Sequence, residues 1–376
     1  MNHIGLTLSG GGARAAYQVG VLRAVYELTK KKVSPFGIVS GVSAGGINST
    51  WLASGSADFD SVTKAMWNTW SQIQFNEIFR TDFLSLAGLG SRLLRDLSLG
   101  QWSGQKRITY LLDTAPLYDF LSSKISIPDL NHNIETGRLH GVAVSATDYR
   151  HGQSVTFYSG NKGISPWKRG IRVGRKSDLS IRHIMASSAI PIFFPPVEVE
   201  GGTFGDGGIG LNAPLSPAVH MGVGKLFVIG IQHLPEVNVD PYFQEYQRVS
   251  IGDIVGTILD SLFMNALDAD LDRLERINLT LSKIPTAGIK NVEALRIIPY
   301  LVIRPSRELG LLQTNEFSRF PATLRHLLRG IGVSEKKGWD LLSYLAFDKD
   351  YTNRLLHLGY DDAYAKKNQI LDFLSS

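Results

Sequence analysis

The sequence predicts an α/β fold built on a parallel sheet. Two short apolar runs, residues 4–10 and 36–43, each end among glycines, and each is followed by a segment whose apolar residues have helical spacing. The order of strand, glycine turn and helix thus occurs twice in succession. It forms a βαβα unit, in which the strands are parallel. Of the 376 residues, 43% are hydrophobic, so the chain can bury a large core.

The other elements follow from periodicity and from chain breakers. A first helix is expected after the first glycines, because apolar residues recur on one face from Val21 to Leu28 and Pro35 lies beyond its end. A second helix is expected directly after Ser43. Further along, the sequence predicts a helix over 62–79, strands at 139–147, 154–159, 225–231 and 297–306, and one long amphipathic helix from Ile251 to Ile277.

Composition excludes several classes of protein. No cysteine occurs, so disulfides, thiolate metal sites and cysteine nucleophiles are ruled out. The net charge of +5 comes from 39 basic and 34 acidic residues with no long block of one sign, which argues against nucleic-acid binding. No apolar run reaches the roughly 18 residues of a membrane-spanning helix, and the N-terminus lacks the features of a signal peptide. We therefore expect a cytoplasmic protein whose membrane contact is peripheral.

The pentapeptide GVSAG, residues 41–45, lies between the second strand and the second helix. A sharp strand-to-helix turn exposes the serine hydroxyl, and small neighbours are needed because the two backbones pass close to each other. A serine nucleophile also needs a base for its proton and donors for the oxyanion. The pattern predicts Ser43 as the nucleophile of an esterase, although the same residue types also form purely structural turns.

The segment GGGAR can supply the oxyanion donors. Gly10, Gly11 and Gly12 lie between a strand and a helix, where uncovered backbone N–H groups favour negative charge, and Arg14 adds a cation beside them. The same glycines, together with Ala15, also fit the dinucleotide pattern G-x-G-x-x-A. A nucleotide site needs a carboxylate at the end of the second strand, and this strand ends without one. We therefore favour the esterase hypothesis.

The base that accepts the serine proton is less evident. Asp206 is one candidate, because GDGG at 205–208 places a lone carboxylate among glycines in an apolar region. A buried aspartate beside a serine hydroxyl can accept its proton directly, whereas Asp-Gly is also a common turn pair. Histidine is the more usual base, but none of the eight that follow Ser43 lies in a loop with active-site character: His132, His140, His151, His183, His220, His233, His326 and His357.

Four motifs in this order resemble those of the patatin-like phospholipases. They are GGGAR after the first strand, GVSAG after the second, ASSAIPIFFPPV at 186–197, and GDGG. The resemblance covers residues 4–235. It implies a three-layer α/β/α patatin-like fold with a mostly parallel central sheet, to which the chain adds a C-terminal helical region.

The resemblance also implies a site and a reaction. Ser43 and Asp206 would form a catalytic dyad without histidine, and a lipid acyl ester would be hydrolysed through an acyl-Ser43 intermediate. No metal or cofactor is implied. The oxyanion hole maps to the glycine-rich loop and its neighbour: Gly10, Gly11, Gly12 and Arg14.

We expect a catalytic domain over 1–305 and a helical extension over 306–376. The leucine-rich segment 81–102 is a candidate lid or membrane-contacting segment. The helix from Ile251 has an acidic polar face, so it is expected to cover the sheet or to pair with a second subunit in a homodimer.

Two other functions stay open from the sequence. An acyltransferase would use the same dyad and differ only in the acceptor of the acyl group. A non-catalytic lipid-binding protein would keep the scaffold, although the intact Ser43, Asp206 and glycine loop argue against it.

Overall fold

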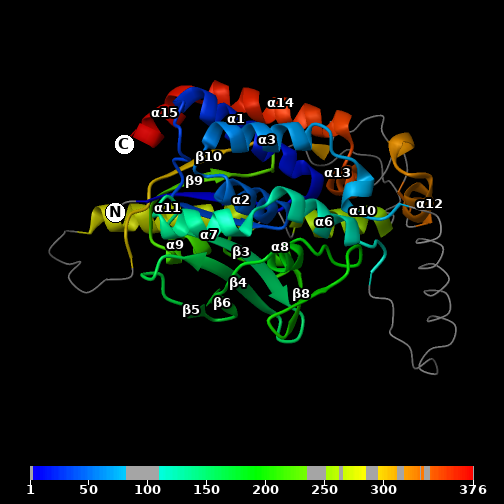
Figure 1. Cartoon of the computed structure of the whole chain (residues 1–376), viewed down its shortest axis with the longest axis horizontal. Helices are drawn as coiled ribbons and strands as arrows, with labels where there is room; N and C mark the ends of the chain where they lie inside the picture. Colours follow the sequence, from blue (N-terminus) through cyan, green and yellow to red (C-terminus); the bar gives the residue numbers. More distant parts are fainter. Residues whose placement is uncertain are drawn as a thin grey trace, which may run out of the picture.

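The structure, a computed structural model, contains one large mixed sheet (Figure 1). It describes residues 3–81, 110–234, 251–261, 266–284, 295–310, 317–330, 332–333 and 339–375. Neighbouring parallel strands follow the order β10 (Tyr300–Ile303), β9 (Val223–Ile229), β1 (His3–Leu8), β2 (Ile38–Val42) and β3 (Gly141–Asp148). Beyond β3 lie β4 (Gln153–Gly160), β6 (Arg172–Lys176) and β5 (Trp167–Arg169), while β7 (Val197–Val199) and β8 (Gly202–Asp206) pair near the end of β3. The predicted mostly parallel sheet is confirmed.

The two faces of the sheet pack on separate hydrophobic clusters, because side chains alternate along a strand. In β9, Phe227 and Ile229 belong to one cluster, whereas Leu226 and Val228 belong to the other. This is the predicted three-layer α/β/α arrangement. Helices of the first cluster include α1 (Ala16–Thr29), α2 (Ala44–Ser54), α3 (Phe59–Trp70) and α14 (Lys349–Ala365), and those of the second are α9 (Ser216–His220) and α11 (Ala266–Lys283).

The helix predicted over 62–79 is wrong in its extent. Helix α3 ends at Trp70, whose carbonyl accepts a hydrogen bond of 2.7 Å from Thr352 Oγ1 of α14. Gln74 then has extended dihedral angles and begins a capping box that starts α4 (Phe75–Ile78). A side chain from the far end of the chain therefore satisfies a carbonyl at the end of α3, where the periodicity of the sequence predicted that the helix continues.

The long helix predicted from Ile251 to Ile277 is described in two pieces. These are α10 (Ile251–Asp260) and α11, and residues 262–265 between them lie outside the described residues. The leucine-rich segment 81–102 also lies outside them from residue 82 onward. Its predicted role as a lid or membrane contact stays a prediction.

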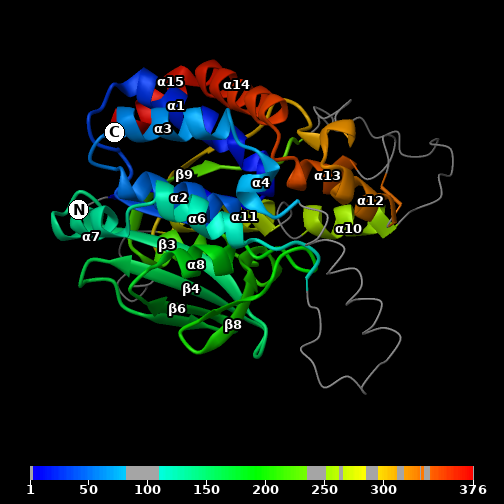
Figure 2. The same ribbon diagram turned by 45° about the vertical axis from the view of Figure 1, so that its right-hand side comes forward.

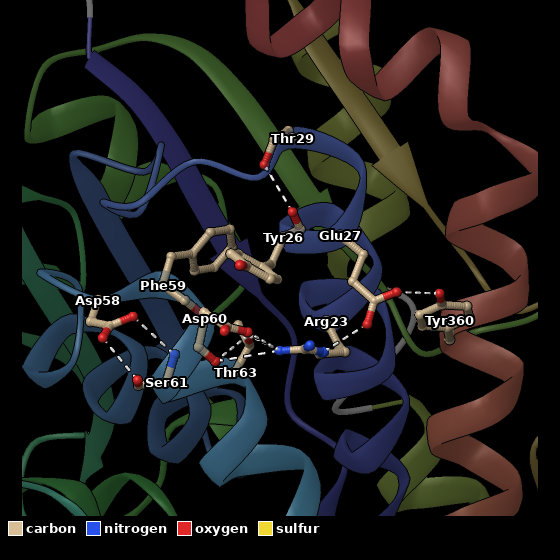
Figure 3. Close-up of polar contacts among 10 residues, drawn as sticks. All are labelled: Arg23, Tyr26, Glu27, Thr29, Asp58, Phe59, Asp60, Ser61, Thr63 and Tyr360. Atoms are coloured by element: carbon tan, nitrogen blue, oxygen red, sulfur yellow. Dashed lines mark hydrogen bonds and ion pairs between the residues drawn. The ribbon is translucent and has the colours of Figure 1, made fainter.

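A polar network joins helices α1, α3 and α14 (Figure 3). Arg23 of α1 donates to Glu27 Oε1 at 3.0 Å and to Asp60 Oδ1 of α3 at 2.7 Å, and Tyr360 of α14 donates to Glu27 Oε2 at 2.6 Å. Figures 1 and 2 show the three helices stacked as one layer. The C-terminal part of the chain thus packs directly on its first helix.

The remaining helices flank these layers. They are α6 (Ala115–Lys124), α7 (Ile127–Glu135), α8 (Ile181–Ser187), α12 (Ala322–Gly330), α13 (Trp339–Leu345) and α15 (Lys367–Ser375).

The division of the chain into a catalytic domain over 1–305 and a helical extension over 306–376 stays a prediction.

Candidate active site

The register of the sheet brings Ser43 and Asp206 to the same point. Strand β2 pairs with β3 as far as Val42, which lies opposite Ser145. Strand β8 then continues along the β3 edge that β2 leaves, with Asp206 opposite Ala146, while β4 occupies the other edge. Ser43 directly follows β2, and Asp206 is the last residue of β8. The two residues therefore lie side by side at the end of these strands.

The turn at Ser43 is strained and tightly packed. Ser43 has φ 56° and ψ −132°, a backbone conformation that residues other than glycine rarely adopt. A Cβ atom at Gly41 would lie 2.2 Å from the Gly45 carbonyl oxygen, so only glycine fits there. The Ser43 N–H donates to Ser187 Oγ at 3.0 Å, and Ser187 Oγ donates to the Ser145 carbonyl at 2.7 Å. These contacts hold the serine in its unusual conformation.

Asp206 is fully buried and held by its backbone as well as its side chain. Its N–H donates to the Ala189 carbonyl at 2.8 Å, its carbonyl accepts from Thr147 Oγ1 at 2.8 Å, and its Oδ1 accepts from the Gly208 N–H at 2.8 Å. Burial raises the pKa of Asp206 to about 7, against hydrogen bonds from Ser43 and Gly208 that lower it. A carboxylate with this pKa can act as a base near neutral pH.

The second carboxylate oxygen of Asp206, Oδ2, accepts no hydrogen bond from the described residues. It is buried and has no hydrogen bond of standard geometry among the described residues. The Ser43 hydroxyl is nevertheless close enough to lower the pKa of Asp206. Hydrogen bonds between catalytic groups are often long without substrate and shorten when it binds.

The glycine-rich loop lies at the same site. Gly12 lines one cavity together with Ser43 and has φ 53°. Within the described residues, the backbone N–H groups of Gly10, Gly11 and Gly12 donate no hydrogen bond. They are thus available to an oxygen atom of a ligand.

The Arg14 side chain is directed toward helices α10 and α13. Its Nε donates to Ser343 Oγ at 2.7 Å, and its Nη1 and Nη2 lie 3.1 Å from Asp260 Oδ1 and 3.3 Å from Asp340 Oδ1. Its backbone N–H donates to the Gly11 carbonyl at 3.1 Å. Arg14 is also absent from the residues that line the cavity at Ser43. This geometry suits a residue that holds the glycine loop in place.

The cavity beside Ser43 is small and apolar. Its volume is about 30 Å³, far below the roughly 300–1,000 Å³ of cavities that bind small molecules. An acyl chain can therefore enter only if wall side chains move. The apolar walls are Ala44, Ile47, Trp51, Trp70, Ile73, Ile78, Leu117, Phe120, Ile190, Phe194 and Phe347.

The histidines have other partners or lie in solvent. Within the described part of the chain, no histidine is hydrogen-bonded to Ser43 or Asp206. His151 pairs with Asp148, His183 with Ser180 and Glu200, and His233 with the Pro305 carbonyl; His3 stacks on His140, His220 on Trp167 and His357 packs edge-on against Trp67, while His132 and His326 are exposed.

The described residues contain no cluster of three or more side chains that could hold a metal ion. In the same part of the chain, no helix has the length and apolar character needed to cross a bilayer.

Three residues at the site were not predicted from the sequence. Ser187 belongs to the segment ASSAIPIFFPPV, a motif that assigns no role to this serine. Asn48 of α2 donates to the Ala15 carbonyl at 3.1 Å and accepts from Trp70 Nε1 at 3.0 Å, so it links the glycine loop to the cavity wall. Tyr344, whose carbonyl lies against Gly12, carries no signal in the sequence.

The comparisons define the class of protein. Residues 6–219 match the sequence model of the patatin-like phospholipases, so the chain belongs to the patatin-like phospholipase family, a family of lipid-hydrolysing enzymes. The chain is 28% identical over 213 residues to the cGAMP-activated phospholipase of Pseudomonas aeruginosa, a match that covers 56% of this chain and 53% of that protein. The chain thus spans about half the length of this curated relative.

Two solved structures align with this chain at TM-scores below 0.5. Human GIVD cytosolic phospholipase A2, in complex with methyl gamma-linolenyl fluorophosphonate, is 12% identical with a TM-score of 0.46, and the match covers 100% of this chain and 59% of that one. VipD from Legionella pneumophila is 14% identical with a TM-score of 0.34, and the match covers 98% of this chain and 67% of that one.

Proposed function

We propose that the protein is a lipid acyl hydrolase in which Ser43 is the nucleophile and Asp206 is its base. The observation that carries the proposal is a fully buried aspartate with a pKa of about 7 beside a strained serine that opens onto an apolar cavity. Membership of the patatin-like phospholipase family supports a lipid ester as substrate.

In the first half of the reaction, Asp206 takes the proton of the Ser43 hydroxyl while the Ser43 oxygen attacks the ester carbonyl. The N–H groups of Gly10, Gly11 and Gly12 then stabilise the oxyanion, together with the N-terminal end of α2. The tetrahedral intermediate collapses to an acyl-serine, and protonated Asp206 gives its proton to the departing alcohol.

In the second half, Asp206 removes a proton from water, which attacks the acyl-serine. The new tetrahedral intermediate collapses, and the proton on Asp206 returns to the Ser43 oxygen. The free fatty acid leaves, and both groups regain their starting states. One carboxylate thus serves as base and acid in turn, and no histidine is required.

The apolar walls of the cavity suit the acyl chain, and the head group would remain outside. Cytoplasmic location, peripheral membrane contact and a homodimer all stay predictions. Transfer of the acyl group to an alcohol instead of water also stays open, and products formed with and without added alcohol distinguish the two.

The test compares Ser43→Ala and Asp206→Ala with the unchanged protein in release of fatty acid from phospholipid vesicles. Both variants are expected to lose at least about a thousandfold in rate. Ser49→Ala is the matched control, because Ser49 is a buried serine of α2, the helix that follows Ser43, and its hydroxyl donates only to the Gly46 carbonyl. A fluorophosphonate probe should label the control and not Ser43→Ala. Full activity in a folded Asp206→Ala variant would refute the dyad.

A further inference from the structure

A second cavity lies on the face of the sheet that α9 and α11 cover. It has a volume of about 450 Å³ and shares no lining residue with the cavity at Ser43. Its walls come from α9, α11, the start of β6 and residues 295–298. Cavities that bind small molecules have volumes of roughly 300–1,000 Å³. This one is therefore large enough for a ligand of moderate size.

The charged groups that line this cavity leave a net positive charge. They are Arg172, Arg273, Arg296 and Asp270. Asp270 is 7% exposed and already has partners, because Oδ1 accepts from Arg273 Nη1 at 2.9 Å and Oδ2 accepts from the Leu215 N–H at 3.0 Å. Arg273 therefore balances Asp270, and two arginines remain.

These two arginines, Arg172 and Arg296, form no ion pair in the described part of the chain, although the charge of Arg172 acts on Asp270 and opposes the burial that raises the pKa of that carboxyl. Arg172 donates no side-chain hydrogen bond there, and Arg296 donates only to the carbonyls of Val223 at 3.3 Å and Val219 at 2.9 Å. Burial and the positive charges of neighbouring arginines, these two among them, lower the pKa of His220. Three arginines thus share one carboxylate, Asp270, and the cavity lining keeps a net positive charge.

The rest of the lining is mostly apolar and includes Leu215, Val219, Leu274, Ile277 and Ile298. We propose that this cavity binds an anionic amphiphile, with a phosphate or carboxylate between Arg172 and Arg296 and an apolar chain along the leucine and isoleucine side chains. A guanidinium group binds either anion through paired N–H donors. A lysophospholipid and a free fatty acid both have this chemistry.

The cavity adjoins the loop that directly follows Asp206. Asn212 and Leu215, which line it, follow Asp206 on one short loop. On that loop Gly210 N donates to Thr147 Oγ1 at 3.1 Å, and Thr147 Oγ1 donates to the Asp206 carbonyl at 2.8 Å. A ligand that moves this loop will change the position of Asp206 and the rate of hydrolysis. The effect on rate rests on the proposed function, whereas the binding does not.

The binding test uses the full chain carrying Ser43→Ala, so that no turnover occurs, and titration calorimetry. Dodecyl phosphate and dodecanoate are the probes, with inorganic phosphate and neutral dodecyl maltoside as comparisons. Either anionic amphiphile should bind at least about a hundredfold more tightly than inorganic phosphate, because the chain buries apolar surface. The tighter of the two probes identifies the anion that the site prefers.

Arg172→Ala, added to the same protein, should weaken binding of that probe at least about tenfold. Arg138→Ala is the matched control, since Arg138 is an exposed arginine that does not line the cavity. Arg296→Ala also removes two bonds to backbone carbonyls, so Arg172→Ala is the decisive variant. Equal affinity in Arg172→Ala and Arg138→Ala, or equal binding of the neutral maltoside, overturns the proposal.

The effect on rate is measured with Ser43 intact. The preferred probe should change hydrolysis of a short soluble ester in the unchanged protein and not in Arg172→Ala. If the probe changes the rate equally in both proteins, the proposed effect of this cavity on Asp206 is overturned. The calorimetry still decides whether the cavity binds the probe. If neither the unchanged protein nor Arg172→Ala hydrolyses the ester, the result counts against the proposed function and not against the binding site.

Discussion

The guanidinium of Arg14 is fully buried, and its Nη1 lies 3.1 Å from Oδ1 of Asp260, a residue of α10. The Tyr344 hydroxyl donates to the same oxygen at 2.7 Å, and the Tyr344 ring lies 4.3 Å from the guanidinium carbon. Both partners lie beyond residue 219, where the match to the family ends. Residues specific to the C-terminal half therefore surround an arginine of the glycine-rich loop.

Arg14→Ala should lower the free energy of unfolding by about 3–5 kcal/mol, because it leaves the Asp260 carboxylate without its buried partner. It should also lower the rate of ester hydrolysis, since the glycine loop loses its anchor. Urea denaturation followed by circular dichroism measures the first effect, and release of fatty acid measures the second.

Arg23→Ala is the control for this prediction. Arg23 pairs with Asp60 and Glu27 between α1 and α3, but all three side chains are partly exposed. Exposed pairs contribute about 1 kcal/mol or less. If Arg14→Ala costs no more than Arg23→Ala, the buried cluster does not stabilise the loop.

Gly12→Ala should abolish hydrolysis while the protein still folds. Its φ of 53° disfavours alanine, and the new Cβ would lie 2.2 Å from the Tyr344 carbonyl oxygen, so the loop must move. Gly137→Ala is a matched control, because Gly137 has φ 73° with no atom within 4 Å of its Cβ position. Both variants carry a backbone cost of roughly 1–2 kcal/mol, but only Gly12→Ala should lose activity. Equal rates in the two variants would contradict a role for the loop geometry.

The elements near the N-terminus could be predicted because their signals are local. Glycines and apolar runs define β1, β2 and the helices that follow them, and the small residues around Ser43 match the close approach of strand and helix. The meeting of Ser43 with Asp206 is not local. It depends on β8 replacing β2 along one edge of β3, a register that no short pattern encodes.

The same limit explains what the sequence left out. The partners of Arg14 come from α10 and α13, and the Trp70 carbonyl at the end of α3 accepts a hydrogen bond from Thr352 of α14. Each is a single polar side chain in a distant helix, without a spacing that marks it. Helical periodicity alone therefore predicted too long a helix at α3. No pattern in the sequence identified the partners of Arg14.

The rate of hydrolysis should depend on the ionisation of Asp206. As a base it must be deprotonated, and its pKa is raised to about 7 by burial. Below that pKa, kcat/KM should fall about tenfold per pH unit, and it should level off above it. The measurement is kcat/KM for an uncharged ester between pH 5 and pH 9. A profile that stays flat from pH 5 to pH 7.5 would show that the base has a lower pKa.

The same group makes the stability depend on pH in the opposite sense to most aspartates. Because the folded pKa of Asp206, about 7, lies above the ordinary aspartate pKa of 3.8, the folded state binds more protons than the unfolded state at pH values between the two. Its contribution to stability is therefore present below pH 4 and is lost as the pH rises to 7. Asp206→Asn should gain up to roughly 4 kcal/mol at pH 8 relative to the unchanged protein. Urea denaturation at pH 5 and pH 8 checks this, and an equal difference at both values would contradict it.

The cavity walls should limit the acyl chains that the protein accepts. Leu117 of α6 is 3% exposed and lines the cavity at Ser43, whose volume is only about 30 Å³. Leu117→Ala should raise the ratio of kcat/KM for p-nitrophenyl octanoate to that for the acetate, because the longer chain gains room near the nucleophile. Leu130→Ala is the control, since Leu130 is a buried leucine of α7 outside the cavity lining. Both variants should lose about 2–5 kcal/mol of stability, so a change in the ratio that appears in both would be an effect of destabilisation and not of the cavity.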